Sequence, residues 1–149
     1  ANGHIGSHIV RYLSSQFLNC QIVMIDNLMT QRYSSLFNFP KSSRFNFIEG
    51  DVNLINLEQI FSHANVVIHL AAITDAAGSF DKAEELEANN YQSTLKVAEA
   101  CVFTDTPLIA LSSTSVYGSQ DKIIGEDCIE LKPQSPYAEV KLLEEKYLI

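Results

Sequence analysis

Short continuous apolar runs alternate along this chain with stretches in which apolar residues recur every three or four positions. The runs are typical of buried parallel strands, and the longer spacing is typical of helices. The runs predict strands at residues 21–26, 45–49, 65–71 and 107–112. The spacing predicts helices at 6–17, 54–62, 82–103 and from 137 onward, a short helix or loop at 30–39, and an irregular segment at 118–134. This alternation predicts one α/β domain over residues 1–149 with a Rossmann-like, doubly wound parallel sheet.

Composition narrows the classes of function. A chain of 149 residues can bury one sizeable core, and its formal net charge of −8 argues against a nucleic-acid-binding surface. No run of about 18 apolar residues predicts a membrane span. Cys20, Cys101 and Cys128 form no CxxC pair, which favours separate reduced thiols in a cytoplasmic protein.

The first residues have the spacing of a dinucleotide-binding loop. Gly3 and Gly6 precede apolar residues at helical spacing, and Asp26 ends an apolar run twenty residues after Gly6. A helix N-terminus binds phosphate, and an acidic residue after the next strand suits a ribose 2′-hydroxyl and repels a 2′-phosphate. The alternative is a tight turn followed by an ordinary aspartate. The combined spacing favours a dinucleotide site that takes NAD.

A second candidate group lies near the end of the chain. Tyr137 and Lys141 are four residues apart and share one face of the expected helix. A cation one turn away favours the phenolate, which can then act as an acid–base catalyst. Ser113 lies 24 residues before Tyr137, where it is either a hydrogen-bond donor to a reacting oxygen or a hydroxyl that caps the next turn.

Taken in order, these motifs resemble those of the NAD-dependent epimerase/dehydratase family, the extended short-chain dehydrogenases. Gly3 and Gly6 match the last two glycines of its TGxxGxxG motif, and residues 111–118 (LSSTSVYG) resemble its SSxxVYG segment. Residues 90–94 (NYQST) resemble NxxGT with Ser93 in place of glycine. Residues 136–141 (PYAEVK) resemble PYxxSK with Val140 in place of serine.

The resemblance implies NAD as cofactor and a nucleotide sugar as substrate. It implies a cofactor site made of Gly3, His4, Ile5, Gly6, Asp26, Asn27, Asp51, Val52, Leu70, Ala71, Ala72, Asn90, Tyr137 and Lys141. It implies substrate contacts from Thr74, Ser113, Thr114 and Tyr137, and no metal ion. Family members commonly dimerise through two helices, which here would be 82–103 and 137–149, so a homodimer is expected of the full-length protein.

The implied mechanism is transient oxidation of the sugar, at C4 by expectation. Tyr137 would take the hydroxyl proton as a phenolate, and Lys141 would favour that phenolate and bind the nicotinamide ribose. Ser113 would hydrogen-bond the reacting oxygen, with Thr114 as the neighbouring candidate.

Two features separate the reactions that this chemistry can serve. Dehydratases of the family often carry Thr-Asp-Glu after the corresponding strand, whereas Ser113-Thr114-Ser115 has no carboxylate. We therefore expect an epimerase, an isomerase, ahead of a 4,6-dehydratase or a UDP-uronate decarboxylase. A protein of another class, an NAD-binding sensor without turnover, would be expected to lack the tyrosine or the lysine. Both residues are present.

The resemblance also predicts that the chain begins inside the glycine motif, without the first strand, and ends before the substrate domain. In a sheet of order 3-2-1-4-5 the first strand is central, so its two neighbours would each expose an edge. We predict that the isolated 149 residues are unstable or close their sheet differently. Thermal unfolding and NAD titration of this polypeptide test the point, and a cooperative melt with full NAD affinity would contradict it.

Overall fold

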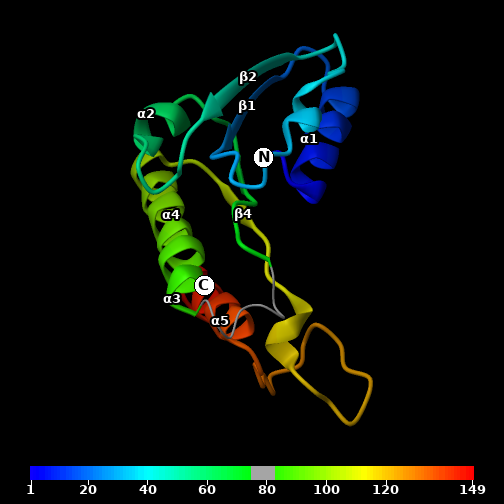
Figure 1. The fold of residues 1–149 in the computed structure, drawn as a ribbon, viewed down its shortest axis with the longest axis vertical. Helices are drawn as coiled ribbons and strands as arrows, with labels where there is room; N and C mark the ends of the chain where they lie inside the picture. Colours follow the sequence, from blue (N-terminus) through cyan, green and yellow to red (C-terminus); the bar gives the residue numbers. More distant parts are fainter. Residues whose placement is uncertain (75–82) are drawn as a thin grey trace. The chain divides into compact units, whose positions relative to one another are not determined.

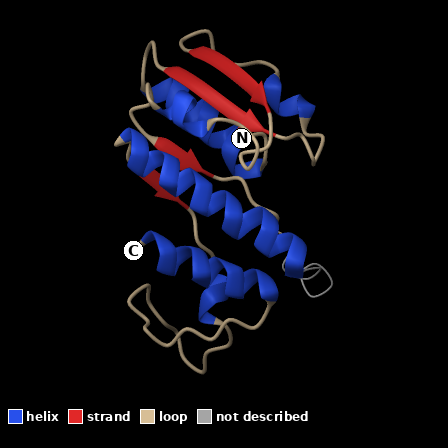
Figure 2. Ribbon diagram, turned by 90° about the vertical axis from the view of Figure 1, so that its left-hand side faces the viewer, coloured by secondary structure: helices blue, strands red, loops and turns tan. Residues whose placement is uncertain are grey.

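The computed structural model describes residues 1–74 and 83–149, and it divides into two units, Ala1–Asn56 and Leu57–Ile149. Each unit contains a pair of parallel strands (Figure 1; Figure 2). In the first unit β1 (Gln21–Asp26) pairs with β2 (Arg44–Glu49), and in the second β3 (Val67–His69) pairs with β4 (Leu108–Ala110). The expected α/β class with parallel strands is confirmed.

The first unit consists of β1, β2, helix α1 (His4–Gln16) and the 3-10 turn η1 (Tyr33–Leu36). Arg11 links α1 to η1 and to the residues that follow it. Its guanidinium donates to the carbonyls of Ser35 and Phe37 and lies 5.1 Å from the centre of the Phe39 ring. Phe39 in turn stacks on Phe45 of β2 at 4.4 Å between ring centres. These contacts connect α1 to η1 and, through Phe39, to β2.

The second unit contains several helices and helical turns besides the β3–β4 pair. They are α2 (Leu57–Phe61), α3 (Ala83–Leu86), the π-helical turn η3 (Glu87–Tyr91), α4 (Gln92–Thr104), the 3-10 turn η4 (Thr114–Tyr117) and α5 (Pro136–Leu148). Within this unit α5 packs against α3, η3, α4 and η4 (Figure 1). An edge-to-face contact of Tyr91 with Tyr147 joins η3 to the end of α5.

The helix expected at 82–103 is a composite. Residue 82 lies outside the described residues, and the remainder is α3, η3 and α4 in succession. The π turn contains Asn90, whose side chain is fully buried. A π turn holds one more residue than an α turn, and such bulges are frequent at functional sites.

Helix α2 is shorter than the segment 54–62 expected for it. It begins at Leu57, because the preceding residues form a turn in which the Asp51 carboxylate accepts the Asn53 N–H at 2.8 Å. The side chain of Leu54 is 85% exposed, so it does not belong to the buried face of the helix. No helix in residues 1–74 and 83–149 is long and apolar enough to cross a membrane.

His69, at the end of β3, is half-buried. Its Nε2 lies 3.1 Å from the Thr94 hydroxyl of α4. Burial, together with the positive charge of Lys141, lowers the pKa of His69 from 6.5 to about 4. The imidazole is therefore neutral at neutral pH.

This lowered pKa predicts a pH dependence of stability. Between pH 6.5 and about 4, His69 is protonated in the unfolded chain but not in the folded chain. Its contribution to the free energy of unfolding is therefore complete above pH 6.5 and is lost as the pH falls through that window. The loss should approach about 3 kcal/mol. His69→Gln should flatten the unfolding free energy of the full-length protein across this window. Parallel curves for the two proteins would contradict the assignment.

Candidate active site

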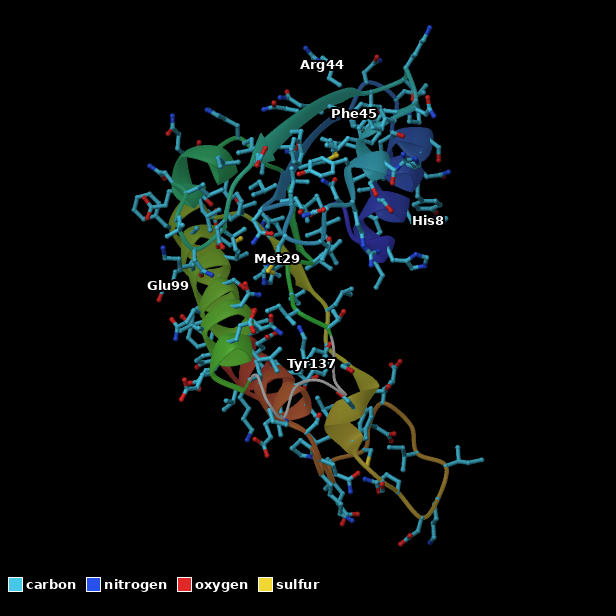
Figure 3. All side chains as sticks on the ribbon, in the orientation of Figure 1. His8, Met29, Arg44, Phe45, Glu99 and Tyr137 are labelled. Atoms are coloured by element: carbon cyan, nitrogen blue, oxygen red, sulfur yellow. The ribbon has the colours of Figure 1, made fainter. Side chains whose placement is uncertain are left out.

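Helix α5 carries the tyrosine and the lysine, and its start is set by local sequence. Ser135 caps the helix by accepting the Ala138 N–H at 3.2 Å, and Pro136 occupies the first turn, where no N–H is needed. Tyr137 therefore lies in the first turn, where Figure 3 labels it, and Lys141 lies one turn later. Both side chains are buried.

The Lys141 ammonium is held by two groups of the second unit. It donates to the Leu111 carbonyl at 3.2 Å and to Glu144 Oε2 at 2.8 Å. Leu111 directly follows β4 and precedes Ser112-Ser113. The ammonium thus links the helix that carries Tyr137 to the strand end that carries Ser113.

Ser113 occupies the turn after β4. Its Oγ accepts the Ser115 N–H at 3.2 Å and the Ser115 hydroxyl at 2.8 Å, so the capping role that the sequence suggested is present. Both bonds use the oxygen as acceptor, and the Ser113 O–H remains a donor. The capping bonds therefore orient the Ser113 hydroxyl and leave its O–H available to donate a hydrogen bond to a reacting oxygen. The Thr114 side chain beside it is exposed.

The segment that leaves β3 is held by Asn90. The amide of Asn90 donates to the Ile73 carbonyl at 2.9 Å and accepts the Ile73 N–H at 2.8 Å, as a neighbouring strand would. This segment contains Leu70, Ala71 and Ala72, which the sequence assigned to the cofactor, and it is followed by the exposed Thr74. Ser93, in the family's glycine position, is buried and donates to the Asn90 carbonyl at 3.0 Å.

The glycine loop of the first unit has the form of an anion site. Gly3 caps α1, and Ser7 is the first residue to donate back to it, so the N–H groups of His4, Ile5 and Gly6 have no helical acceptor. A Cβ at Gly3 would meet no protein atom within 4 Å, whereas one at Gly6 would strike the Ala1 carbonyl. Open space at Gly3 and a close approach at Gly6 fit a loop that binds pyrophosphate.

Asp26 ends β1 with three hydrogen bonds to its carboxylate. Oδ2 accepts from the amino group of Ala1 and the Asn2 N–H, and Oδ1 accepts the Leu28 N–H. Burial alone would raise the pKa of Asp26, but these hydrogen bonds outweigh it and lower the pKa. An ionised carboxylate with acceptor capacity left fits a ribose hydroxyl and disfavours a 2′-phosphate.

Asn27 and Asp51 follow β1 and β2, and the Asn27 amide donates to Asp51 Oδ2 at 3.4 Å. Val52, next to Asp51, is half-buried. The first unit therefore brings together the residues expected to bind the adenosine and pyrophosphate parts of the cofactor. In the second unit, Lys141 joins the helix that carries Tyr137 to the end of the strand that precedes Ser113.

Four contacts of the site had not been expected from sequence, and they involve Glu144, Leu111, Ile73 and Thr94. Glu144 could have been suspected, since it lies three residues after Lys141 on the same helix face. The other three act through the backbone or through a common hydroxyl, for which sequence carries no signal. Within residues 1–74 and 83–149 no group of three or more His, Cys, Asp or Glu side chains could hold a metal ion.

The chain is similar in sequence and in fold to several known nucleotide-sugar enzymes. A trifunctional UDP-glucose 4,6-dehydratase/UDP-4-keto-6-deoxy-D-glucose 3,5-epimerase/UDP-4-keto-L-rhamnose-reductase of Arabidopsis thaliana is 31% identical over 95% of this chain and 23% of its own length. The structure of the UDP-N-acetylglucosamine 4-epimerase from Methanobrevibacter ruminantium has a TM-score of 0.88 at 33% identity, over 98% of this chain and 46% of that one.

A UDP-glucuronic acid 4-epimerase from Bacillus cereus, solved with UDP-glucuronic acid and NAD, has a TM-score of 0.86 at 32% identity, over 98% of this chain and 48% of that one. The chain thus spans less than half the length of each of these three proteins. Its sequence matches the NAD dependent epimerase/dehydratase family over residues 1–149. This chain belongs to that NAD-dependent family.

Proposed function

We propose that this chain carries the cofactor-binding and catalytic part of a nucleotide-sugar epimerase that acts at sugar C4. The observation that supports this most is the link from Lys141 to Leu111, which joins the Tyr137 helix to the Ser113 turn within one unit. A tyrosine, a lysine and a serine hydroxyl on these elements can provide the acid–base catalysis and the hydrogen bond that oxidation and re-reduction of an alcohol require.

NAD, when bound, would supply the hydride acceptor and donor that oxidation and re-reduction of the sugar carbon require. The chain's own residues handle the proton and the position of the oxygen. Tyr137 takes the proton from the C4 hydroxyl and gives it back. The Lys141 cation stabilises the phenolate and binds the nicotinamide ribose, and the Ser113 O–H donates to the C4 oxygen.

The turn after β4 favours an epimerase over a 4,6-dehydratase. Removal of water across C5 and C6 needs an acid and a base, and residues 112–115 offer hydroxyl groups alone. Dehydratase activity stays the second candidate, because a relative that this chain resembles is a UDP-glucose 4,6-dehydratase. Decarboxylation of a UDP-uronate by the same 4-keto route is a further alternative.

The same family membership supports one broader proposal. The substrate is a nucleotide sugar, since the relatives and solved neighbours named above act on or bind such compounds. Assembly of the full-length protein as a homodimer and its place in the cytoplasm remain predictions from sequence.

The proposal predicts the behaviour of a Tyr137→Phe variant of the full-length protein. We expect the wild type to form the C4 epimer of UDP-glucose, UDP-N-acetylglucosamine, UDP-glucuronate or dTDP-glucose, as followed by proton NMR. Removing the phenolic oxygen should lower kcat about a hundred- to ten-thousand-fold, because the proton acceptor is lost, while NAD stays bound.

Tyr147→Phe is the matched control, because Tyr147 lies on the same helix with its hydroxyl 3.5 Å from Glu99 Oε1. This control should keep wild-type activity. A 4-keto-6-deoxy product would identify a dehydratase instead. No conversion of any sugar with NAD still bound would contradict the proposal and favour an NAD sensor.

A further inference from the structure

The partner of the lysine in α5 has no role in the function proposed so far. Glu144 Oε2 lies 2.8 Å from Lys141 Nζ, and the two side chains are only 6% and 9% exposed. The same carboxylate has a second oxygen, Oε1, which is buried and has no hydrogen-bond partner among the described residues. Within the described residues, Glu144 is therefore a buried charge that has the lysine as its one hydrogen-bond partner.

Stability does not account for this arrangement. Taking two charges out of water costs several kcal/mol for each ion, and the attraction between them repays that cost only when the remaining lone pairs are satisfied. Here one carboxylate oxygen is unsatisfied within the described structure. Buried pairs of this kind can often be replaced by apolar side chains without loss of stability. The pair is thus better explained by what it does to Lys141.

The geometry defines that effect. An ammonium has three N–H donors. One points to the Leu111 carbonyl and one to Glu144, so the rotation of the group is fixed and a single N–H is left. Without Glu144, the ammonium would keep one anchor and could rotate about it.

We propose that Glu144 is a positioning residue for Lys141: it keeps the buried ammonium charged and, together with the Leu111 carbonyl, directs its third N–H. That N–H is the one left for a cofactor ribose hydroxyl. The inference rests on the proposed function for the role of Lys141, although the ion pair itself does not.

Glu144 also sets the net charge that neighbouring groups experience. The titratable neighbours of the pair are Tyr137, one turn earlier on α5, and His69 on β3. The elements packed against α5 add the exposed carboxylates of α3, η3 and α4 and the phenols of η3 and η4, which are Glu84, Glu85, Glu87, Glu99, Tyr91 and Tyr117. Lys96 on α4 is the remaining cation on these elements in the described residues.

Glu144→Gln keeps the shape of the side chain and removes one negative charge beside Lys141. Loss of an anion favours the phenolate of Tyr137 and disfavours the ammonium of Lys141, so each group should lose its proton at lower pH. Glu139→Gln makes the same chemical change on an exposed residue of the same helix, where solvent screens the charge. It is the matched control.

The first readout needs no sugar turnover. Phenolate absorbance of the full-length protein is titrated with pH, and the same titration in a Tyr137→Phe background is subtracted to isolate Tyr137. In Glu144→Gln the Tyr137 phenolate should form about one pH unit lower than in wild type, a tenfold change in the equilibrium. Glu139→Gln should match the wild type. A folded Glu144→Gln protein with the wild-type titration would overturn the proposal.

The second readout is the pH dependence of kcat together with NAD affinity. In Glu144→Gln the activity profile should move as a whole toward lower pH, and NAD should bind about three- to tenfold more weakly because the third N–H is no longer directed. If Glu144→Gln fails to fold, Glu144→Asp takes its place. Its withdrawn carboxylate should give an intermediate shift of the Tyr137 titration, and an unmoved titration would again overturn the proposal.

The two readouts separate this inference from the function on which it rests. If the wild type converts no nucleotide sugar but the phenolate titration moves as stated, the epimerase proposal fails and the positioning role stands. If the wild type turns over sugar and both the titration and the activity profile of the variant are unchanged, the positioning role fails and the epimerase stands.

Discussion

The buried ammonium of Lys141 joins helix α5 to the end of strand β4 in the second unit. The Lys141 side chain leaves α5, reaches the carbonyl that follows β4, and is held there by the carboxylate of Glu144. Along the chain, the end of β4 and helix α5 are separated by the turn η4 and by residues 118–134, which form neither strand nor helix. Because a buried charge must find partners, the lysine constrains both elements to one arrangement. The position of Tyr137 follows from that constraint, since it lies one helical turn before the lysine.

The second constraint comes from parallel strands. Their carboxyl ends lie at one edge of a sheet, so the residues that follow them gather there. Asp26 ends β1 and Asp51 comes after β2, whereas Leu70 and Leu111 follow β3 and β4. Polar side chains bind the backbone at two of these strand ends. Asp26 accepts the N–H of Asn2 in the glycine loop and the N–H of Leu28 after β1, and Asn90 pairs with Ile73. These hydrogen bonds fix loop residues whose backbone is not paired with a neighbouring strand.

Much of this architecture is readable in the sequence, and the failures have physical causes. Continuous apolar runs located all four strands, although β3 is limited to Val67–His69 because the hydrogen-bond ladder ends before the apolar run does. Periodicity did not reveal the π turn at Glu87–Tyr91, since one extra residue in a turn leaves helical spacing nearly unchanged. Glu144 was overlooked because a charged residue on a helix is usually solvated. Only the structure shows that this one is buried against Lys141.

An epimerase that works through the Ser113, Tyr137 and Lys141 site removes the hydrogen on sugar C4 and returns it to the same carbon. This is tested most directly by giving the full-length protein a nucleotide sugar deuterated at C4, in ordinary water, and locating the deuterium in the product by NMR. The proposed epimerase should give an epimer that keeps its deuterium at C4. Deuterium that moved to C6 would indicate a dehydratase, and deuterium lost to solvent or a C4 centre left unchanged would contradict the proposed chemistry.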